Sequence, residues 1–237
     1  MTNKEWKNIW DKNAKQVKPK NLYDLLKLDG FSSPTSEINL NEWKKYTNYF
    51  IKKYNIQQNQ SVLEIGCGCG AFLYFFSKKK IKCFGIDYSK ELIRIAKKFF
   101  KKNNFFVGQA NNLSQIKNKK FDFIFANSVF QYFGNLKYAK QVLDEIIKIS
   151  HVNTKIIILD IPDKKKYSLW QKSAIKKIGL ADFRKTYKNS KHKFYEKKFF
   201  YNYASSNKLN ISISNQTLIK KENNKFRFNI FLNYEKK

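Results

Sequence analysis

The stretch from Ser61 to Phe72, SVLEIGCGCGAF, constrains the fold more than any other part of the chain. Val62, Leu63 and Ile65 form a short apolar run that is typical of a buried parallel strand. Three glycines at alternate positions follow, and from Ala71 the apolar pattern becomes helical, which predicts a helix over 71–79. A strand, a glycine turn and a helix bring backbone N–H groups against a nucleotide-like ligand. The stretch therefore predicts a ligand site at the carboxyl end of a parallel strand.

Two acidic residues flank this glycine turn. Glu64 lies two positions before Gly66, and Asp87 ends a second apolar run at 82–87. A carboxylate at the end of the second strand can accept hydrogen bonds from both hydroxyls of a ribose. The spacing Gly-x-Gly-x-Gly departs from the Gly-x-Gly-x-x-Gly fingerprint of dinucleotide sites. The pattern therefore favours a nucleoside ligand and argues against a nicotinamide cofactor.

With both acids in place, Leu-Glu-Ile-Gly-Cys-Gly-Cys-Gly and Gly-Ile-Asp-Tyr-Ser resemble the first two motifs of the class I S-adenosylmethionine-dependent methyltransferases. The resemblance covers residues 55–162, and it is to the small-molecule type of this family. It implies a Rossmann-like α/β fold, S-adenosylmethionine as the cofactor, and methyl transfer by in-line displacement. The sulfonium is already an activated donor, so such an enzyme needs mainly to place the nucleophile.

The resemblance implies cofactor contacts where the strands of the core end. The implied residues are Glu64, Gly66, Cys67, Gly68, Gly70, Asp87, Tyr88, Gln109, Ala110, Asn111, Asn112, Asn127 and Ser128. Many relatives have an acid at the position of Gln109, which binds the adenine amino group. An amide can accept from that amine and donate to a ring nitrogen. Gln109, Asn111 and Asn112 therefore all stay open for this role.

Aromatic and amide side chains are the candidates for the acceptor side. The candidate substrate-binding residues are Tyr23, Phe130, Gln131, Tyr132 and Trp170. The segment 127–133 resembles the family's loop that lines the methyl group, and an electron-rich aromatic face suits a sulfonium cation. Tyr23 and the loop at 31–36 are candidates for a lid. Plain core packing is the alternative for each of these aromatic residues.

Three polar residues are candidates to exchange a proton with the acceptor: His192, Tyr132 and Asp160. His192 lies where the chain returns to the sheet, and a histidine pKa of about 6.5 suits proton transfer near neutral pH. A histidine in a lysine-rich loop can instead be a plain surface residue, and then placement alone drives the reaction. His151 lies in a turn away from the ligand, so it receives no role.

We expect the chain, 1–237, to form a single α/β domain around a doubly wound, seven-stranded, mostly parallel sheet. Residues 1–55 are expected to form a helical cap and 56–162 the cofactor-binding core. Residues 163–194 form an insertion that either closes the substrate pocket or is a solvated excursion. Residues 195–237 then give a helix and an antiparallel hairpin at one edge of the sheet.

Capping residues set the expected helix starts, which are Asn21, Asn39 or Asn41, and Ser89. Apolar runs set the expected strands at 61–66, 82–87, 105–108, 121–127, 155–161, 209–215 and 225–233.

The formal charge of +30 suggests nucleic acid as a partner. The positive charge is almost all lysine, because the only arginines are Arg94, Arg184 and Arg227. Arginine is the better residue for bidentate contacts with phosphates and bases. The fourth strand also lacks the Asn-Pro-Pro-Tyr or Pro-Cys segment of nucleic-acid base methylases. The sequence therefore favours a small acceptor such as a sugar or an amine. An RNA methyltransferase is the alternative, and a nucleotide-binding oxidoreductase or an inactive binding module is a third hypothesis.

Three cysteines, two of them in the glycine turn, make no disulfide framework. Cys67 and Cys69 have no second pair at zinc spacing, so no metal site is expected. No signal peptide and no long apolar span is visible, so we expect a cytoplasmic protein without a membrane partner. The sequence does not indicate an oligomeric state.

Overall fold

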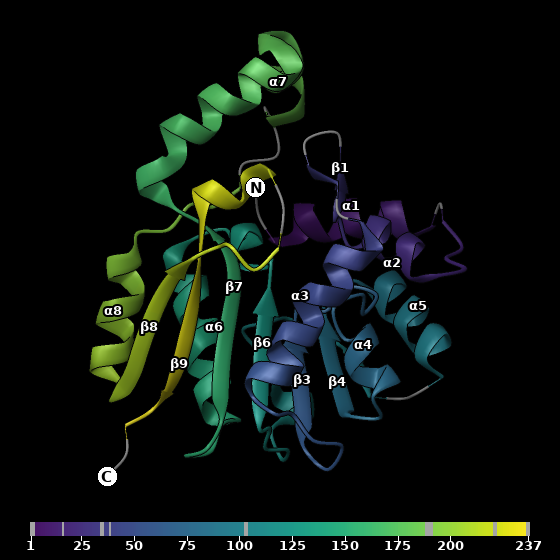
Figure 1. Cartoon of the computed structure of the whole chain (residues 1–237), viewed down its shortest axis with the longest axis vertical. Helices are drawn as coiled ribbons and strands as arrows, with labels where there is room; N and C mark the ends of the chain where they lie inside the picture. The colour runs from purple at the N-terminus through teal and green to yellow at the C-terminus, as the bar shows by residue number, and fades with distance from the viewer. Residues whose placement is uncertain are drawn as a thin grey trace.

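A computed structural model describes residues 3–15, 17–33, 36–37, 39–101, 104–187, 192–219 and 222–235. Within these residues, one seven-stranded sheet has the order β5-β4-β3-β6-β7-β9-β8 (Figure 1). Its strands are β3 (Ser61–Ile65), β4 (Lys82–Asp87), β5 (Phe105–Val107), β6 (Phe123–Asn127), β7 (Lys155–Pro162), β8 (Leu209–Asn215) and β9 (Arg227–Tyr234). The pairs among β3 to β7 are parallel, whereas β9 is antiparallel to both β7 and β8. The predicted mostly parallel sheet with an antiparallel C-terminal hairpin is confirmed.

Helices connect these strands, and α2, α3, α5 and α6 begin at polar caps. Their bounds are α1 (Asn3–Lys15), α2 (Leu22–Leu28), α3 (Leu40–Lys53), α4 (Tyr74–Lys78), α5 (Lys90–Phe100), α6 (Leu136–Lys148), α7 (Tyr167–Tyr187) and α8 (Lys197–Ser206). The side chains of Asn21, Asn39, Ser89 and Asn135 each accept a hydrogen bond from a backbone N–H in the first turn of α2, α3, α5 and α6. Such a cap satisfies a donor that the helix itself leaves unpaired.

The two faces of the sheet carry separate hydrophobic cores because side chains alternate along each strand. Val62 and Phe125 belong to the core shared with α3, α4 and α5. Leu63 and Ile124, their neighbours along β3 and β6, belong to the core shared with α6 and α8. All four side chains are fully buried, and each such burial contributes about 1.5–3 kcal/mol. Helices on both faces therefore make the sheet doubly wound.

The N-terminal helices lie near the end of the sheet where the parallel strands stop. In Figure 1, α1 and α7 lie at the top of the molecule, beyond the tip of β6. Helix α1 contacts α5, and α2 leads into a short antiparallel ladder of β1 (Ser32–Ser33) with β2 (Ser36–Glu37). The loop expected at 31–36 therefore contains this ladder, while Pro34 and Thr35 lie outside the described residues. Because of this position, these elements cover any site at the strand ends, and we call them the roof of that site.

The expected insertion at 163–194 is mostly one long helix, α7. Its backbone kinks at Gly179, where φ is +80°. Trp170, Phe183 and Phe226 are buried in a small third cluster, while Leu169 on the same helix is 60% exposed. The division of the chain into cap, core, insertion and hairpin stays a prediction. No helix in the described part of the chain is long and apolar enough to cross a membrane.

Candidate active site

A cavity lies at the carboxyl ends of the central parallel strands. It contains about 760 Å³ of empty space, part of which opens to solvent. The residues named from the sequence that line it are Glu64, Gly66, Cys67, Gly68, Asp87, Tyr88, Ala110, Asn127, Ser128 and Tyr132. They come from the glycine turn, from β4, and from the segments after β5 and β6. The fold therefore brings most of the implied cofactor residues to one place.

The glycine turn is closely packed by the protein's own side chains. Gly66 and Gly68 have φ values of +69° and +53°, which a side chain rarely adopts. A Cβ on Gly66 would lie 2.3 Å from Val129, and one on Gly68 would lie 2.1 Å from Oδ1 of Asp29. A Cβ on Gly70 would lie 2.7 Å from a ring atom of Phe100. Glycine is thus required here by neighbouring residues, and Gly70 packs away from the cavity lining.

Asp87 is held at the end of β4 by two backbone donors. Its Oδ2 accepts from the N–H of Gly68 at 3.0 Å, and its Oδ1 accepts from the N–H of Ser89 at 2.8 Å. Burial raises the pKa of Asp87 to about 6, against the two N–H donors that lower it. Each carboxylate oxygen has two lone pairs, so the side chain can also accept from two ligand hydroxyls.

Glu64 and Asn127 each present a buried polar atom without a partner to the cavity. Glu64 is 2% exposed, and burial raises its pKa well above the ordinary value. Asn127 is 5% exposed, and its Oδ1 accepts from the hydroxyl of Tyr46 at 2.9 Å. Among the described residues, Oε2 of Glu64 and Nδ2 of Asn127 have no hydrogen-bond partner. An unpaired buried group costs about 1–3 kcal/mol, so both atoms are suited to bind a ligand.

Asp29, which follows α2, is a site residue that the sequence did not indicate. Its Oδ1 accepts from the N–H of Cys69 at 2.7 Å, and its Oδ2 accepts from the N–H of Ala71 at 3.1 Å. Burial raises the pKa of Asp29 to about 7. The contact joins residues about forty positions apart, so local spacing carries no signal for it. The only local feature of the sequence at this position is the Asp-Gly pair that follows an apolar helix.

Aromatic rings from three segments meet beside the cavity. Trp10 and Tyr132 line it, with ring centroids 5.5 Å apart. Trp6 lies 4.8 Å from Tyr132 and stacks on His192 at 5.6 Å. The His192 ring also meets the edge of Tyr132 at 5.3 Å, but His192 is not among the residues that line the cavity. The segments 31–36 and 127–133, which the sequence indicated, also contribute Phe31, Val129 and Phe133 to the lining, whereas the sequence did not indicate Phe72, Ile86, Leu92, Gly108 and Tyr138.

Asp160 lies behind the cavity wall in a buried polar network. The Ser128 hydroxyl donates to Oδ2 of Asp160. Nη1 of Arg227 donates to the Asp160 carbonyl at 2.7 Å, lies 3.2 Å from Oδ2, and also donates to Oε1 of Gln131. Ser128 and Asp160 have φ values of +53° and +63°. Two left-handed residues at adjacent strand ends cost free energy that the surrounding hydrogen bonds must offset.

The adenine candidates after β5 lie outside the cavity lining. Gln109 is exposed, and Oδ1 of Asn112 accepts from the N–H of Ser114 at 3.1 Å. Nδ2 of Asn111 donates to Gln141 at 3.1 Å. Ala110, between them, does line the cavity. The assignment of Gln109, Asn111 or Asn112 to the adenine amine therefore stays a prediction.

Four candidates for substrate binding also lie away from the lining. Phe130 is buried in the core, and Gln131 is buried against Arg227. Trp170 is buried in the cluster of α7. The ring of Tyr23 lies 4.3 Å from the Lys27 ammonium. For these four residues to take part in substrate binding, they must either act on the cavity through other residues or move toward it.

Comparison with known proteins relates part of the chain to methyltransferases. A model described as a methyltransferase domain matches residues 63–158, the range that holds the glycine turn, Asp87 and Ser128. Residues 63–158 therefore resemble a methyltransferase domain, and this range is less than half of the chain. S-adenosylmethionine is the methyl donor and the cofactor of such a domain.

Curated and solved relatives resemble this chain over different lengths. Enniatin synthase of Fusarium equiseti is 31% identical over 115 residues, which are 46% of this chain but only 4% of that much longer protein. A methyltransferase of Clostridium acetobutylicum has a TM-score of 0.60 at 14% identity, over 84% of this chain and 93% of that one. The plantazolicin methyltransferase BpumL, solved with SAH, has a TM-score of 0.62 at 16% identity, over 98% of both chains. Identities this low show the shared fold alone.

Proposed function

We propose that this chain transfers the methyl group of S-adenosylmethionine to a small-molecule acceptor by in-line displacement. The observation that carries the proposal is the pair of unpartnered buried atoms on the cavity wall, Oε2 of Glu64 and Nδ2 of Asn127. One is an acceptor and the other a donor. The amino-acid part of the cofactor offers an ammonium and a carboxylate, which satisfy one acceptor and one donor. Asp87 would hold the ribose hydroxyls.

The residues of the acceptor side would act mainly by placement. Bound S-adenosylmethionine supplies an activated methyl group, so holding a nucleophile in line can provide about 7–11 kcal/mol of the barrier. Trp10 and Tyr132 form an aromatic wall that can orient a flat or apolar acceptor and exclude water.

A base is required only when the acceptor carries a proton that must leave. Ser128 lines the cavity and is hydrogen-bonded to Asp160, so it connects the acceptor side to a carboxylate. His192 contacts Tyr132, which lines the cavity, and it remains a candidate base. Tyr132 is a poor candidate for the base, because burial raises its pKa and keeps the phenol protonated, so the phenolate that could accept a proton is not populated.

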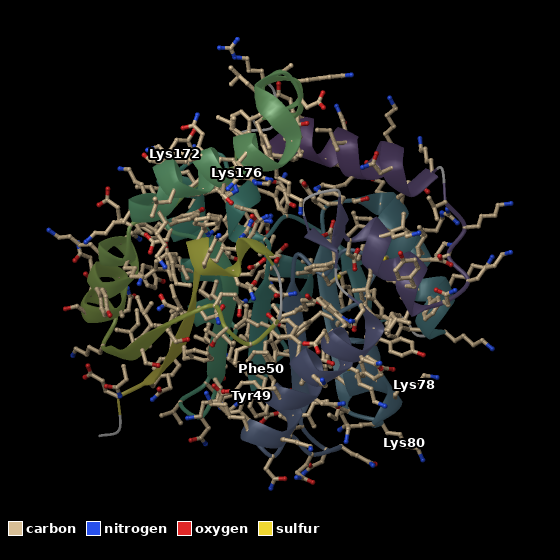
Figure 2. The ribbon with its side chains drawn as sticks, turned by 45° about the horizontal axis from the view of Figure 1, so that its top comes forward. Tyr49, Phe50, Lys78, Lys80, Lys172 and Lys176 are labelled. Carbon is tan, nitrogen blue, oxygen red and sulfur yellow. The ribbon has the colours of Figure 1, made fainter. Side chains whose placement is uncertain are left out.

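The distribution of charge supports a small acceptor over RNA. Lys172 and Lys176 project from α7 on one side of the molecule, while Lys78 and Lys80 lie beside α4 on another (Figure 2). Arg227 is buried in the polar network behind the cavity wall. The solved relatives include methyltransferases named for plantazolicin and for magnesium protoporphyrin IX. These observations support the proposal, and an RNA acceptor is the alternative that the experiment must distinguish.

Isotope labelling of an extract tests the proposal directly. The chain is incubated with S-adenosylmethionine labelled at the methyl group and with a cell extract separated into small-molecule, RNA and protein fractions. We expect label in the small-molecule fraction, and mass spectrometry then identifies the product. Label in the RNA fraction that ribonuclease removes would favour the alternative. Absence of S-adenosylmethionine binding by calorimetry would refute the proposed function altogether.

A further inference from the structure

Every backbone N–H group of the glycine turn, from residue 66 to residue 71, donates a hydrogen bond within the protein itself. The acceptors are the carbonyls of Ile86 and Cys67 and the carboxylates of Asp29 and Asp87. In a phosphate-binding turn such N–H groups instead point at the ligand. The shape of this turn is therefore set by acceptors that the protein supplies.

Asp29 differs from the other acceptors because it comes from the N-terminal part of the chain. Its carboxylate spans the turn, with Oδ1 2.7 Å from the backbone nitrogen of Cys69 and Oδ2 3.1 Å from that of Ala71. The thiol of Cys69 also donates to the carbonyl of Leu25 on α2 at 3.4 Å. The end of α2 is thus bonded to the glycine turn by a side chain and by a main-chain group.

The carboxylate of Asp29 lies among other acids rather than beside a cation. Among the described residues that line the cavity there is no lysine, arginine or histidine. Burial raises the pKa of Asp29 to about 7, with a smaller contribution from the charge of Asp87, while the N–H groups of Cys69 and Ala71 lower it. These two backbone donors therefore stabilise the ionised form of Asp29.

Other titratable groups lie on the elements around Asp29, so its effect must be isolated with a matched variant. They are Glu64 on β3, Cys67 and Cys69 in the turn, Asp87 on β4, the phenols of Tyr88, Tyr132 and Tyr138, and the ion-paired Lys7 and Asp11 on α1. Burial raises the pKa of Glu64 and of both thiols well above their ordinary values. It also raises the pKa of Asp87 to about 6 and those of the three phenols.

We propose that Asp29 is a positioning residue, which holds the glycine turn in the shape that binds the cofactor and so makes α2 part of the cofactor site. This inference rests on the proposed function. Residues 66–68 of the turn line the cavity, and Asp29 fixes the residues that follow them, Cys69 and Ala71. Because Asp29 acts through the turn, it affects S-adenosylmethionine and S-adenosylhomocysteine alike. Protonation turns one acceptor oxygen of Asp29 into an O–H group and weakens one of the two bonds, so the ionised form favours binding.

Calorimetry with matched variants tests this role. Affinities for both ligands are measured at pH 8 for the wild type, for Asp29→Asn, and for Asp24→Asn, which alters an acid on the same helix outside the cavity lining. The amide of Asp29→Asn keeps one acceptor but turns its NH₂ group toward the second backbone N–H. We expect it to weaken both ligands by about tenfold, the effect of one hydrogen bond to a charged group, and we expect Asp24→Asn to weaken neither. Unchanged affinity in Asp29→Asn, or a loss confined to one ligand, would overturn the proposal.

The pH profile separates positioning from general damage to the fold. Binding favours the ionised form of Asp29, so the ratio of wild-type affinity to that of Asp29→Asn for S-adenosylhomocysteine should rise about fivefold between pH 6 and pH 8. Contributions from Asp87 and Glu64 are present in both proteins and cancel in this ratio. A damaged fold would weaken binding by the same factor at every pH, and a constant ratio would therefore overturn the proposal.

A measurement on the wild type alone does not depend on how the variant folds. Nuclear magnetic resonance follows the amide protons of the glycine turn in the ligand-free protein as the pH rises. We expect those of Cys69 and Ala71 to shift with a midpoint of about 7, the pKa of Asp29, and that of Gly68 to shift with a midpoint of about 6, the pKa of Asp87. Amides of Cys69 and Ala71 that do not respond near pH 7 would overturn the proposal. Failure of the wild type to bind either ligand would instead overturn the proposed function.

Discussion

The hydroxyl of Ser89 donates to Oδ1 of Asp11 across 2.5 Å and so joins α1 to the first turn of α5. Ser89 also caps α5, because its Oγ accepts from the N–H of Leu92 at 3.2 Å. One side chain thus both starts a helix of the core and fastens the helix that carries Trp6 and Trp10. The roof of the cavity is therefore attached next to Asp87.

Breaking this contact should loosen the roof without unfolding the core. We expect Asp11→Ala to destabilise the docking of α1 by about 1–3 kcal/mol, the cost of losing a hydrogen bond to a charged group. Hydrogen exchange of amides within α1 should accelerate accordingly, while β3 and β6 stay protected. Asp11→Asn, which keeps an acceptor oxygen for Ser89, is the matched control. Equal exchange rates in Asp11→Ala and the wild type would show that the contact does not hold α1.

Asp87 should contribute directly to cofactor affinity. Asp87→Ala removes the expected acceptor of the ribose hydroxyls, and we expect a loss of about 1–3 kcal/mol in the binding free energy of S-adenosylmethionine. Isothermal calorimetry measures this, and Asp182→Ala, an exposed position on α7, serves as the control. Wild-type affinity in Asp87→Ala would remove Asp87 from the cofactor site.

His192 can be tested as a base separately from its packing on Trp6. If it accepts the acceptor's proton, His192→Asn lowers turnover by about 10²–10⁴-fold with unchanged cofactor affinity. His192→Phe keeps an aromatic ring against Trp6, and its turnover should fall by a similar factor. His151→Asn, at the opposite end of the sheet, should retain wild-type turnover. Activity in His192→Phe within a few-fold of the wild type would mean that the ring serves packing alone.

The buried carboxyl groups of Asp29 and Asp87 should make the stability of the cofactor-free protein depend on pH. Burial raises the pKa of Asp87 to about 6 and that of Asp29 to about 7. Between pH about 4, where these groups ionise in an unfolded chain, and their raised values, the folded chain binds more protons. Stability falls with rising pH wherever this is so, which means that the contribution of these groups declines as pH rises toward 7.

Denaturant titrations between pH 4 and 8 check this dependence. Asp29→Asn removes one of the protonating groups, so we expect its slope of unfolding free energy against pH to differ from the wild type. The difference is at most about 1.4 kcal/mol per pH unit for one proton. The variant should lose less stability on going from low to neutral pH. Superimposable slopes would show that Asp29 ionises normally in the folded protein.

RNA binding, if measured, should be weak and unspecific. Contacts between lysines and phosphates release counterions, so affinity should fall steeply as salt rises. Filter binding of several unrelated RNA sequences over a range of salt concentrations provides the measurement. Tight, sequence-selective binding near physiological salt would promote the RNA methyltransferase hypothesis.

Local signals in the sequence predicted most of the framework. Strand β4 was predicted with its observed bounds, because an apolar run ends in Asp87 and the cap Ser89 follows at once. Strand β6 begins at Phe123 instead of residue 121, because the Asp122 carboxylate is used to bond Ser61 on the neighbouring strand. Helix α4 begins at Tyr74 instead of residue 71, since the residues after the glycines continue the turn.

Long-range contacts account for what the sequence did not reveal in the site. Asp29 reaches the glycine turn because α2 packs on the core, and no spacing among residues 20–30 indicates this contact. The partner of Asp160 is Arg227 on a strand that is far along the chain but adjacent in the sheet. Trp170 carried the same apolar signal as a pocket residue, yet α7 buries it in a cluster of its own. Composition and periodicity predict that a side chain is buried, but they do not predict in which hydrophobic cluster it is buried.

The bond between Arg227 and Asp160 has a consequence for the order in which the site forms during synthesis. The glycine turn, Asp87 and Asn127 have all been synthesised before Asp160, but the arginine that holds Asp160 is 67 residues behind its partner. At 5–20 residues per second, that interval is roughly 3–13 s. A nascent chain can therefore assemble the nucleoside half of its site well before the half that receives the methyl group. In the proposed assignment of roles, the residues that would hold the donor are therefore synthesised before the arginine that fixes the acceptor side.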